Sequence, residues 1–324
     1  MKSSDLRWQA ERLLLNAHHS PRRIVLIHTA VSLGASLLLA LFNFLLSHMI
    51  SGTGGLSGMG TRSLLTTGQA VVELAVTILL PFWNIGLVRA AMNWARKESV
   101  QPATLLEGFR RFVPVLGVNL MRGALFLLAG MAVTYLGTTL FMFTPFADRL
   151  TEALRPFIEE AGGSATMESL MTEEIIAQIF PATVPLLIFL GVLLAVVFIP
   201  LFYRVRFADF AAMDGARPLI CILESFRITK KKCLQIFKID LSFWWFYLLQ
   251  ALSVGLCYGD MLLQALGVTL PMSPAVAYFL FFTLGIVCQG VLLWRCQAQV
   301  SATYAVTYDV LSAPPVYNQS ANPQ

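Results

Sequence analysis

Long apolar runs constrain this sequence more than any other feature. Residues 24–50 are almost entirely apolar and, at ~1.5 Å per helical residue, would form a rod of about 40 Å. That length is enough to cross the roughly 30 Å hydrocarbon core of a bilayer and exceeds the apolar segment of a signal peptide. Hydrophobic residues make up 57% of the chain and charged residues 13%, with a mean hydropathy of +0.70. The sequence therefore predicts an integral membrane protein.

The apolar runs predict an all-α fold, a polytopic bundle of six transmembrane helices within a single domain over residues 1–311. Amphipathic segments between the hairpins, including residues 1–23, predict helices on the membrane surface. The predicted spans are 24–50, 69–92, 113–143, 181–203, 236–259 and 275–296, and the last can continue as one helix to Tyr308. Residues 312–324 are rich in Pro, Asn and Ser, which predicts a disordered tail.

The longest connection, residues 144–180, predicts an amphipathic insertion. Apolar residues recur at helical spacing in two stretches, one on each side of Gly162 and Gly163, and neither stretch is long enough to cross a bilayer. Acidic residues predominate over basic ones throughout it. We expect two short helices that lie flat on the bilayer or over the mouth of the bundle.

The distribution of Lys and Arg predicts which side each loop faces. On this topology, all of the 23 basic residues except Arg62, Arg149 and Arg155 fall on or near the side that holds the N-terminus. The positive-inside rule then places both termini in the cytoplasm and residues 144–180 outside. The basic pI of 9.0 is explained by these loops, so no nucleic-acid partner is expected.

A short segment occurs twice, since residues 105–110 match residues 222–227 without a gap, each just before a predicted span. Such a pattern is typical of related hairpins, and parallel repeats also occur in transporters. A wider set of residues carries a family resemblance: Gly86, Arg96, Lys97, Glu98, residues 106–109, Pro200, Arg206, Phe207, Asp214, Ser225, Phe237, residues 240–244, Ala302, Tyr304 and Tyr308.

With these residues, above all the run from Asp240 to Phe243, the chain resembles a family of bacterial, largely Gram-positive, polytopic membrane proteins of unknown function. That family is distantly similar to the membrane module of some glycerophosphodiester phosphodiesterases. The resemblance implies a multi-pass protein of the bacterial cytoplasmic membrane. It supplies no activity, since the chain has no phosphodiesterase domain, and the insertion at 144–180 is longer than the family leads us to expect.

Ionisable residues within spans are costly, so each is a candidate binding residue. Four qualify: Glu73, Arg122, Lys238 and Asp240. Lys238 and Asp240 lie near the end of their span, where Lys can reach the headgroups and a structural role is favoured. Glu73 lies in the outer half of its span and needs a charge partner or a proton, which leaves a proton-coupled role open.

Arg122 lies about ten residues into its span, too deep for easy contact with the headgroups. It requires an internal partner, in either a buried structural pair or a site for an anion or a lipid headgroup. Asp240 occupies a comparable place in the next repeat. We therefore predict that Arg122 pairs with Asp240, directly or through water, and that Glu73 lies too far outward to be its main partner.

No motif predicts a metal, a cofactor or catalysis. The five cysteines show no CxxC spacing and predict reduced packing residues, while His28 and His48 are isolated in the sequence. Phosphate-binding, zinc-protease and nucleophile-elbow motifs are missing from the sequence. We therefore expect a protein that is not an enzyme.

Two classes of function remain. The first is a module that binds or helps move a small or lipid-like molecule, with the lipid bilayer as its surroundings. The alternative is a structural or regulatory protein whose amphipathic helices recruit a membrane protein partner or sense the bilayer. A polar cavity within the bundle would favour the first class, and a dry, filled bundle would favour the second.

Overall fold

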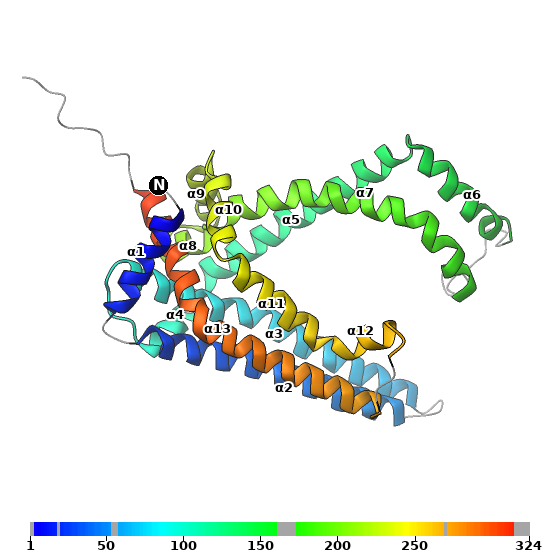
Figure 1. Cartoon of the computed structure of the whole chain (residues 1–324), viewed down its shortest axis with the longest axis horizontal. Helices are drawn as coiled ribbons and strands as arrows, with labels where there is room; N and C mark the ends of the chain where they lie inside the picture. Colours follow the sequence, from blue (N-terminus) through cyan, green and yellow to red (C-terminus); the bar gives the residue numbers. More distant parts are fainter. Residues whose placement is uncertain (1–2, 18–19, 53–57, 161–172, 269–270, 314–324) are drawn as a thin grey trace, which may run out of the picture. The chain divides into compact units, whose positions relative to one another are not determined.

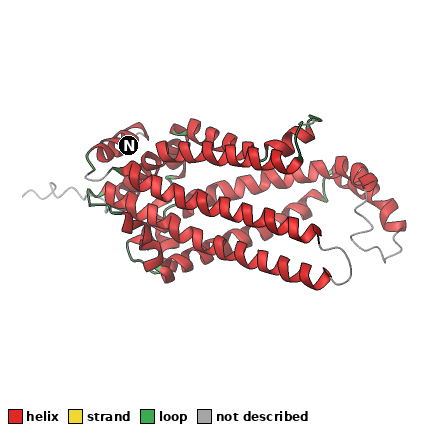
Figure 2. Ribbon diagram, turned by 90° about the horizontal axis from the view of Figure 1, so that it is seen from below, coloured by secondary structure: helices red, strands yellow, loops and turns green. Residues whose placement is uncertain are grey.

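The computed structural model describes residues 3–17, 20–52, 58–160, 173–268 and 271–313, and these are helical apart from short connections (Figure 2). The described residues contain no strand, which confirms the predicted all-α class. The chain forms two compact units, unit 1 from Met1–Val118 with Phe207–Gln324 and unit 2 from Asn119–Arg206. The predicted extent of a single domain, 1–311, stays a prediction.

Unit 1 brings together the two ends of the chain (Figure 1). Its helices are α1 (Ser3–Leu15), α2 (Pro21–Gly52), α3 (Gly58–Ala95), the 3-10 helix η1 (Pro102–Leu106), α4 (Glu107–Arg110), the start of α5 (Phe112–Phe141), α8 (Ala208–Met213), α9 (Pro218–Thr229), α10 (Cys233–Ser242), α11 (Trp244–Cys257), α12 (Gly259–Ala265) and α13 (Pro274–Ser312). The long helix α13 lies at its centre and packs against α1, α2, α3 and α11. Pro274 at its first turn and extended backbone at Ser273 define where α13 begins.

Unit 2 contains the rest of α5, then α6 (Pro145–Glu160) and α7 (Glu173–Val205). The Leu190 side chain of α7 packs against α5 at Gly137, where an added Cβ would lie 2.5 Å from it. Phe126 of α5 and Phe198 of α7 form a separate contact further along the two helices, with their ring centroids 5.3 Å apart.

Within the described part of the chain, five stretches of helix are long and apolar enough to cross a membrane. They are Pro21–Leu46, Leu65–Ala95, Phe112–Phe141, Thr183–Met213 and Val276–Ser312. Three of these stretches belong to unit 1, namely Pro21–Leu46, Leu65–Ala95 and Val276–Ser312. In the most apolar part of each, only 22%, 22% and 11% of the residues, respectively, are buried. Helices that expose so much apolar surface require lipid around them, so the chain is a multi-pass membrane protein.

The predicted fifth span, 236–259, is divided in the structure. Helices α10 and α11 meet at Phe243 with a bend of 68°, and together they could form a sixth span. The break has local causes: the Ser242 hydroxyl donates to the Ile239 carbonyl at 2.7 Å, and Phe243 is buried with φ −110° and ψ 21°. Arg7 of α1 then donates to the Ser242 carbonyl at 3.2 Å, which satisfies a carbonyl that the break exposes.

The predicted helix within residues 1–23 is present as α1, but protein covers part of the face predicted to lie on the bilayer. Leu6 and Ala10 are 6% and 0% exposed, and α1 packs against α10 and α13. An amphipathic stripe indicates only that one face needs an apolar partner, and here helices of unit 1 supply it.

The predicted insertion, 144–180, is only partly a separate element. Its first helix is present as α6, while residues 173–180 belong to α7 and run directly into the span. Pro181 was expected to begin that span, yet α7 continues through it, as membrane helices tolerate. Residues 161–172, between the two helices, lie outside the described part. The predicted tail, 312–324, also lies outside it except for Ser312 and Ala313.

The internal repeat has a structural counterpart at each copy. Glu107 pairs with Arg110 at 2.9 Å in the first copy, and Glu224 pairs with Arg227 in the second. The small residue between them is buried in both: Gly108 lies against α3, and Ser225 accepts a hydrogen bond from the Phe207 backbone at 3.1 Å. Both copies thus use a small residue to bring a short helix against the preceding chain.

Candidate functional site

Polar side chains follow one face of α2 and one face of α13 through otherwise apolar helices. They recur at intervals of one or two helical turns, the spacing that places them on one side of a helix. On α2 they are His28, Thr29, Ser32 and Ser36, and on α13 they are Gln289, Gln297 and Ser301.

These two faces meet at a pocket of about 450 Å³ that is formed by α2, α3, α11 and α13. Asn84 of α3 and Gln250 of α11 add to its polar lining, and the apolar lining comes from Leu33, Leu80, Leu87, Val88 and Leu293. Pockets that hold small molecules typically range from about 300 to 1,000 Å³. The volume is therefore suitable for a small ligand.

His28 lines this pocket and packs against Trp83 of α3. Its ring stacks on Trp83 with the centroids 5.8 Å apart and an angle of 3° between the planes. The indole nitrogen of Trp83 donates to the His28 backbone carbonyl at 3.1 Å, which gives the buried N–H the partner it needs. Neither of these two contacts gives the Nε2 atom of His28 a hydrogen bond.

Three buried polar atoms at the pocket have no hydrogen-bond partner among the described residues: His28 Nε2, Thr29 Oγ1 and Ser32 Oγ. His28 and Thr29 are 8% and 4% exposed. Leaving such a group unpaired costs about 1–3 kcal/mol, and lipid chains offer no hydrogen bonds in place of water. A cluster of three therefore requires an explanation beyond packing.

The chemistry of the pocket is that of an uncharged hydrogen-bonding site. None of its lining residues is Lys, Arg, Asp or Glu. Its amides, hydroxyls and imidazole can both donate and accept hydrogen bonds, so they match alcohols, amides and similar neutral groups. Charge in the sequence does not indicate this pocket, whereas the spacing of His28, Ser32 and Ser36 could have indicated it.

None of the four residues predicted from the sequence lines this pocket. Glu73 of α3 accepts hydrogen bonds from Asn43 of α2 at 2.9 Å and from Gln69 at 3.1 Å. The sequence led us to expect a charge partner or a proton for Glu73. The structure instead shows two neutral amides, one from α2 and one from α3, as its hydrogen-bond donors.

Asp240 lies on α10 and accepts hydrogen bonds from two tyrosine hydroxyls. Tyr247 of α11 donates at 2.7 Å, and Tyr304 of α13, which is 4% exposed, donates as well. Asp240 therefore joins three helices of unit 1 at the break beside Phe243. Arg122 lies on α5 in unit 2, and its predicted pairing with Asp240 stays a prediction.

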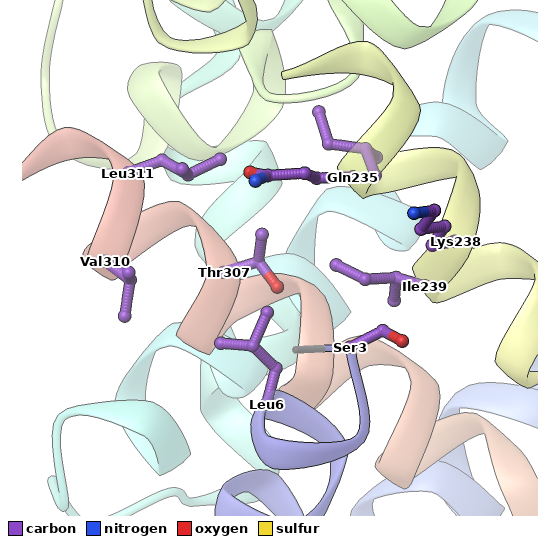
Figure 3. A pocket seen from close by; sticks show the side chains of 9 residues that line it. Ser3, Leu6, Gln235, Lys238, Ile239, Thr307, Val310 and Leu311 are labelled. Atoms are coloured by element: carbon purple, nitrogen blue, oxygen red, sulfur yellow. The ribbon is translucent and has the colours of Figure 1, made fainter. Parts of the chain in front are cut away.

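Lys238 is exposed and lies at a second, smaller pocket of about 260 Å³ (Figure 3). This pocket is formed by α1, α10 and α13, and Gln235 and Thr307 point into it. Its remaining lining is mostly aliphatic: Leu6, Ile236, Ile239, Val310 and Leu311, with Ser3. The structure thus places Lys238 and Asp240 on the same short helix but gives them different surroundings.

A charged cluster joins α3, α8 and α13 beyond the apolar stretches. The Arg96 guanidinium binds Asp214 at 2.7 and 3.1 Å and Asp309 at 2.9 Å. Tyr308 donates to Asp214 at 3.1 Å. The hydrogen bonds that Arg96 donates to these carboxylates raise its pKa above the ordinary value, so it stays charged at any accessible pH. Because the one guanidinium binds both carboxylates, the cluster links the end of α3 to the end of α8 and to α13, which indicates a structural role.

No protein-family model, curated protein or solved structure matches this chain. The described residues contain no group of three or more His, Cys, Asp and Glu that could hold a metal ion. The uncharged pocket is therefore the strongest candidate site, and its geometry alone carries the functional argument.

Proposed function

We propose that this multi-pass membrane protein binds a small, uncharged hydrogen-bonding molecule, or the polar end of a lipid-like molecule, and helps to move it. The binding site is the pocket between α2, α3, α11 and α13. One observation carries the proposal: three buried polar atoms without partners line a pocket of about 450 Å³ among apolar helices. A bound ligand would supply the missing hydrogen bonds.

The proposed ligand class follows from the lining. Desolvating a charged group inside the bilayer is costly, and no lining residue carries an opposite charge to offset that cost. Hydroxyl and amide groups are less costly to desolvate. The side-chain amides of Gln289, Gln297 and Gln250 can both donate hydrogen bonds to such groups and accept hydrogen bonds from them. A neutral polar molecule is therefore favoured over an ion.

We also propose the setting. The chain would lie in a bacterial cytoplasmic membrane with both termini in the cytoplasm and six spans, the bent pair of α10 and α11 counting as one. The distribution of Lys and Arg supports the orientation. The resemblance to bacterial polytopic membrane proteins supports the setting, and the role is binding without catalysis because the sequence contains no catalytic motif.

A second candidate is a structural or regulatory role through amphipathic helices. Helix α6 favours it, because Phe146 is 46% exposed while Arg149 lies over its ring at 5.8 Å from the centroid. Such a face suits contact with a membrane surface or a membrane protein partner. This candidate needs no ligand in the pocket between α2, α3, α11 and α13.

Native mass spectrometry tests the first proposal directly. The full chain, purified in detergent from the membranes that produced it, should retain a small neutral molecule. The double variant Gln289→Leu with Gln297→Leu should lose it, while Gln264→Leu, at an exposed position of α12, should retain it. Retention of the same molecule by the double variant would contradict the proposal, as would the absence of any bound molecule in the natural chain.

A further inference from the structure

A third hollow lies between α11 and α13, and its lining is mostly apolar. It is a groove of about 540 Å³ whose lining shares no residue with the polar pocket. Most of the lining is apolar: Trp245, Leu249, Leu252, Leu256, Val287, Val291 and Leu292, with Ser253, Cys288, Arg295 and Cys296. Leu252, Val287 and Val291 are 61%, 55% and 56% exposed, so the groove opens to the surroundings of the helices.

The two helices cross closely near the far end of this groove. A Cβ built on Gly285 would lie 2.8 Å from the Ser253 carbonyl oxygen and 2.4 Å from the Cys257 sulfur. From that crossing the groove runs along both helices toward Trp245 and Arg295. Such a narrow apolar channel has the shape and chemistry of a site for a hydrocarbon chain.

Positive charge gathers at the other end. Arg295 is exposed and lines the groove one helical turn beyond Val291. Arg7 of α1 lies near this end, because its guanidinium contacts the Ser242 carbonyl at 3.2 Å and the Phe243 ring, two residues before Trp245 of the lining. No Asp or Glu lines the groove. Its charged end therefore favours an anion.

We propose that this groove binds an anionic phospholipid of the surrounding bilayer. One acyl chain would lie between α11 and α13, and the phosphate would pair with Arg295. Arg binds phosphate through two parallel hydrogen bonds, and basic sites between membrane helices select anionic headgroups. Trp245 also lines the groove, and tryptophan is a residue type enriched where a membrane meets water. Arg7 adds a second positive charge from α1.

This site is independent of the pocket between α2, α3, α11 and α13. A lipid held here would join α11, α1 and α13 at the break beside Phe243, and so it would stabilise the folded chain. A ligand that binds only the folded state raises its unfolding temperature. The effect should depend on the headgroup charge and on the acyl chain together.

The test compares lipids on the full chain in detergent. Phosphatidylglycerol should raise the unfolding temperature several-fold more than phosphatidylcholine with the same chains, and inorganic phosphate should have little effect. Arg295→Gln should lose most of the difference between the two lipids. Arg22→Gln removes an equal charge at an exposed position of α2, and it should keep that difference.

Equal stabilisation by the two lipids would overturn the proposal, as would a full response of Arg295→Gln or a full response to inorganic phosphate alone. If Arg295→Gln does not fold, a competition experiment on the natural chain tests the proposal. Native mass spectrometry of the natural chain in an equal mixture of the two lipids should then show phosphatidylglycerol retained in excess, and equal retention would refute the site.

Discussion

Two buried threonines show how differently polar side chains are used in the spans. Thr303 of α13 donates from Oγ1 to the Gln299 carbonyl at 2.7 Å, which satisfies its hydroxyl within its own helix. Thr29 of α2 is 4% exposed, and its Oγ1 has no partner among the described residues. The first hydroxyl serves the fold, while the second is available to a ligand at some cost in stability.

This contrast leads to opposite effects of the same substitution. Thr29→Val should raise the free energy of unfolding by about 1 kcal/mol, because it removes a buried hydroxyl that lacks a partner. Thr303→Val should lower it by about 1 kcal/mol, because it removes a hydrogen bond. Thermal unfolding in detergent measures both, and an equal loss in the two variants would show that the Thr29 hydroxyl is satisfied within the fold.

The sequence permits only part of the site to be predicted at this scale. Asp240 and Glu73 were recognised as costly charges within spans, and both do have specific hydrogen-bond partners. Those partners, Tyr247 and Asn43, could not be predicted, because which side chains meet depends on how helices pack. His28 was treated as isolated because most residues that line the pocket with it come from three other helices.

At the scale of elements, one pair of glycines fixes how α3 meets η1 and α4. A Cβ on Gly86 would lie 1.9 Å from the Leu105 carbonyl oxygen, and a Cβ on Gly108 would lie 1.9 Å from the Phe82 carbonyl oxygen. These contacts are between backbones, which cannot move aside as a flexible side chain can. The short helices can therefore approach α3 only where both positions lack a side chain.

Gly86→Ala should accordingly destabilise the protein by about 1–3 kcal/mol, because the helices must separate. Gly34→Ala on α2 is the matched control, since nothing lies within 4 Å of its added Cβ. It should be neutral or stabilise by up to about 1 kcal/mol through better helix propensity. Unfolding of the two variants in the same detergent tests the crossing, and similar stabilities would contradict it.

The extent of a helix could be predicted where it depends on length and hydropathy. It could be predicted less well where it depends on local hydrogen bonds. The runs that became α2 and α13 are long enough that only membrane helices fit them. The break at Phe243 depends on the Ser242 hydroxyl and on Arg7 from the distant helix α1. A hydropathy pattern contains neither contact, so it predicts one continuous span there.

At the scale of the whole molecule, the central claim is that the pocket between α2, α3, α11 and α13 is a binding site that a polar solute can enter. The alternative is a dry bundle whose polar residues only pack. The two differ in whether a water-soluble reagent can reach Ser32. Ser32 lines the pocket, whereas Leu38, less than two turns further along α2, is 68% exposed on an apolar face.

Cysteine labelling separates these possibilities in a background from which the five native cysteines are removed. Ser32→Cys and Leu38→Cys would each be exposed to a charged, membrane-impermeant thiol reagent in lipid vesicles, with the reagent supplied on each side in turn. The account predicts that Ser32→Cys reacts from one side at least ten-fold faster than Leu38→Cys. Equal, negligible labelling at both positions would show a dry bundle and contradict the proposed site.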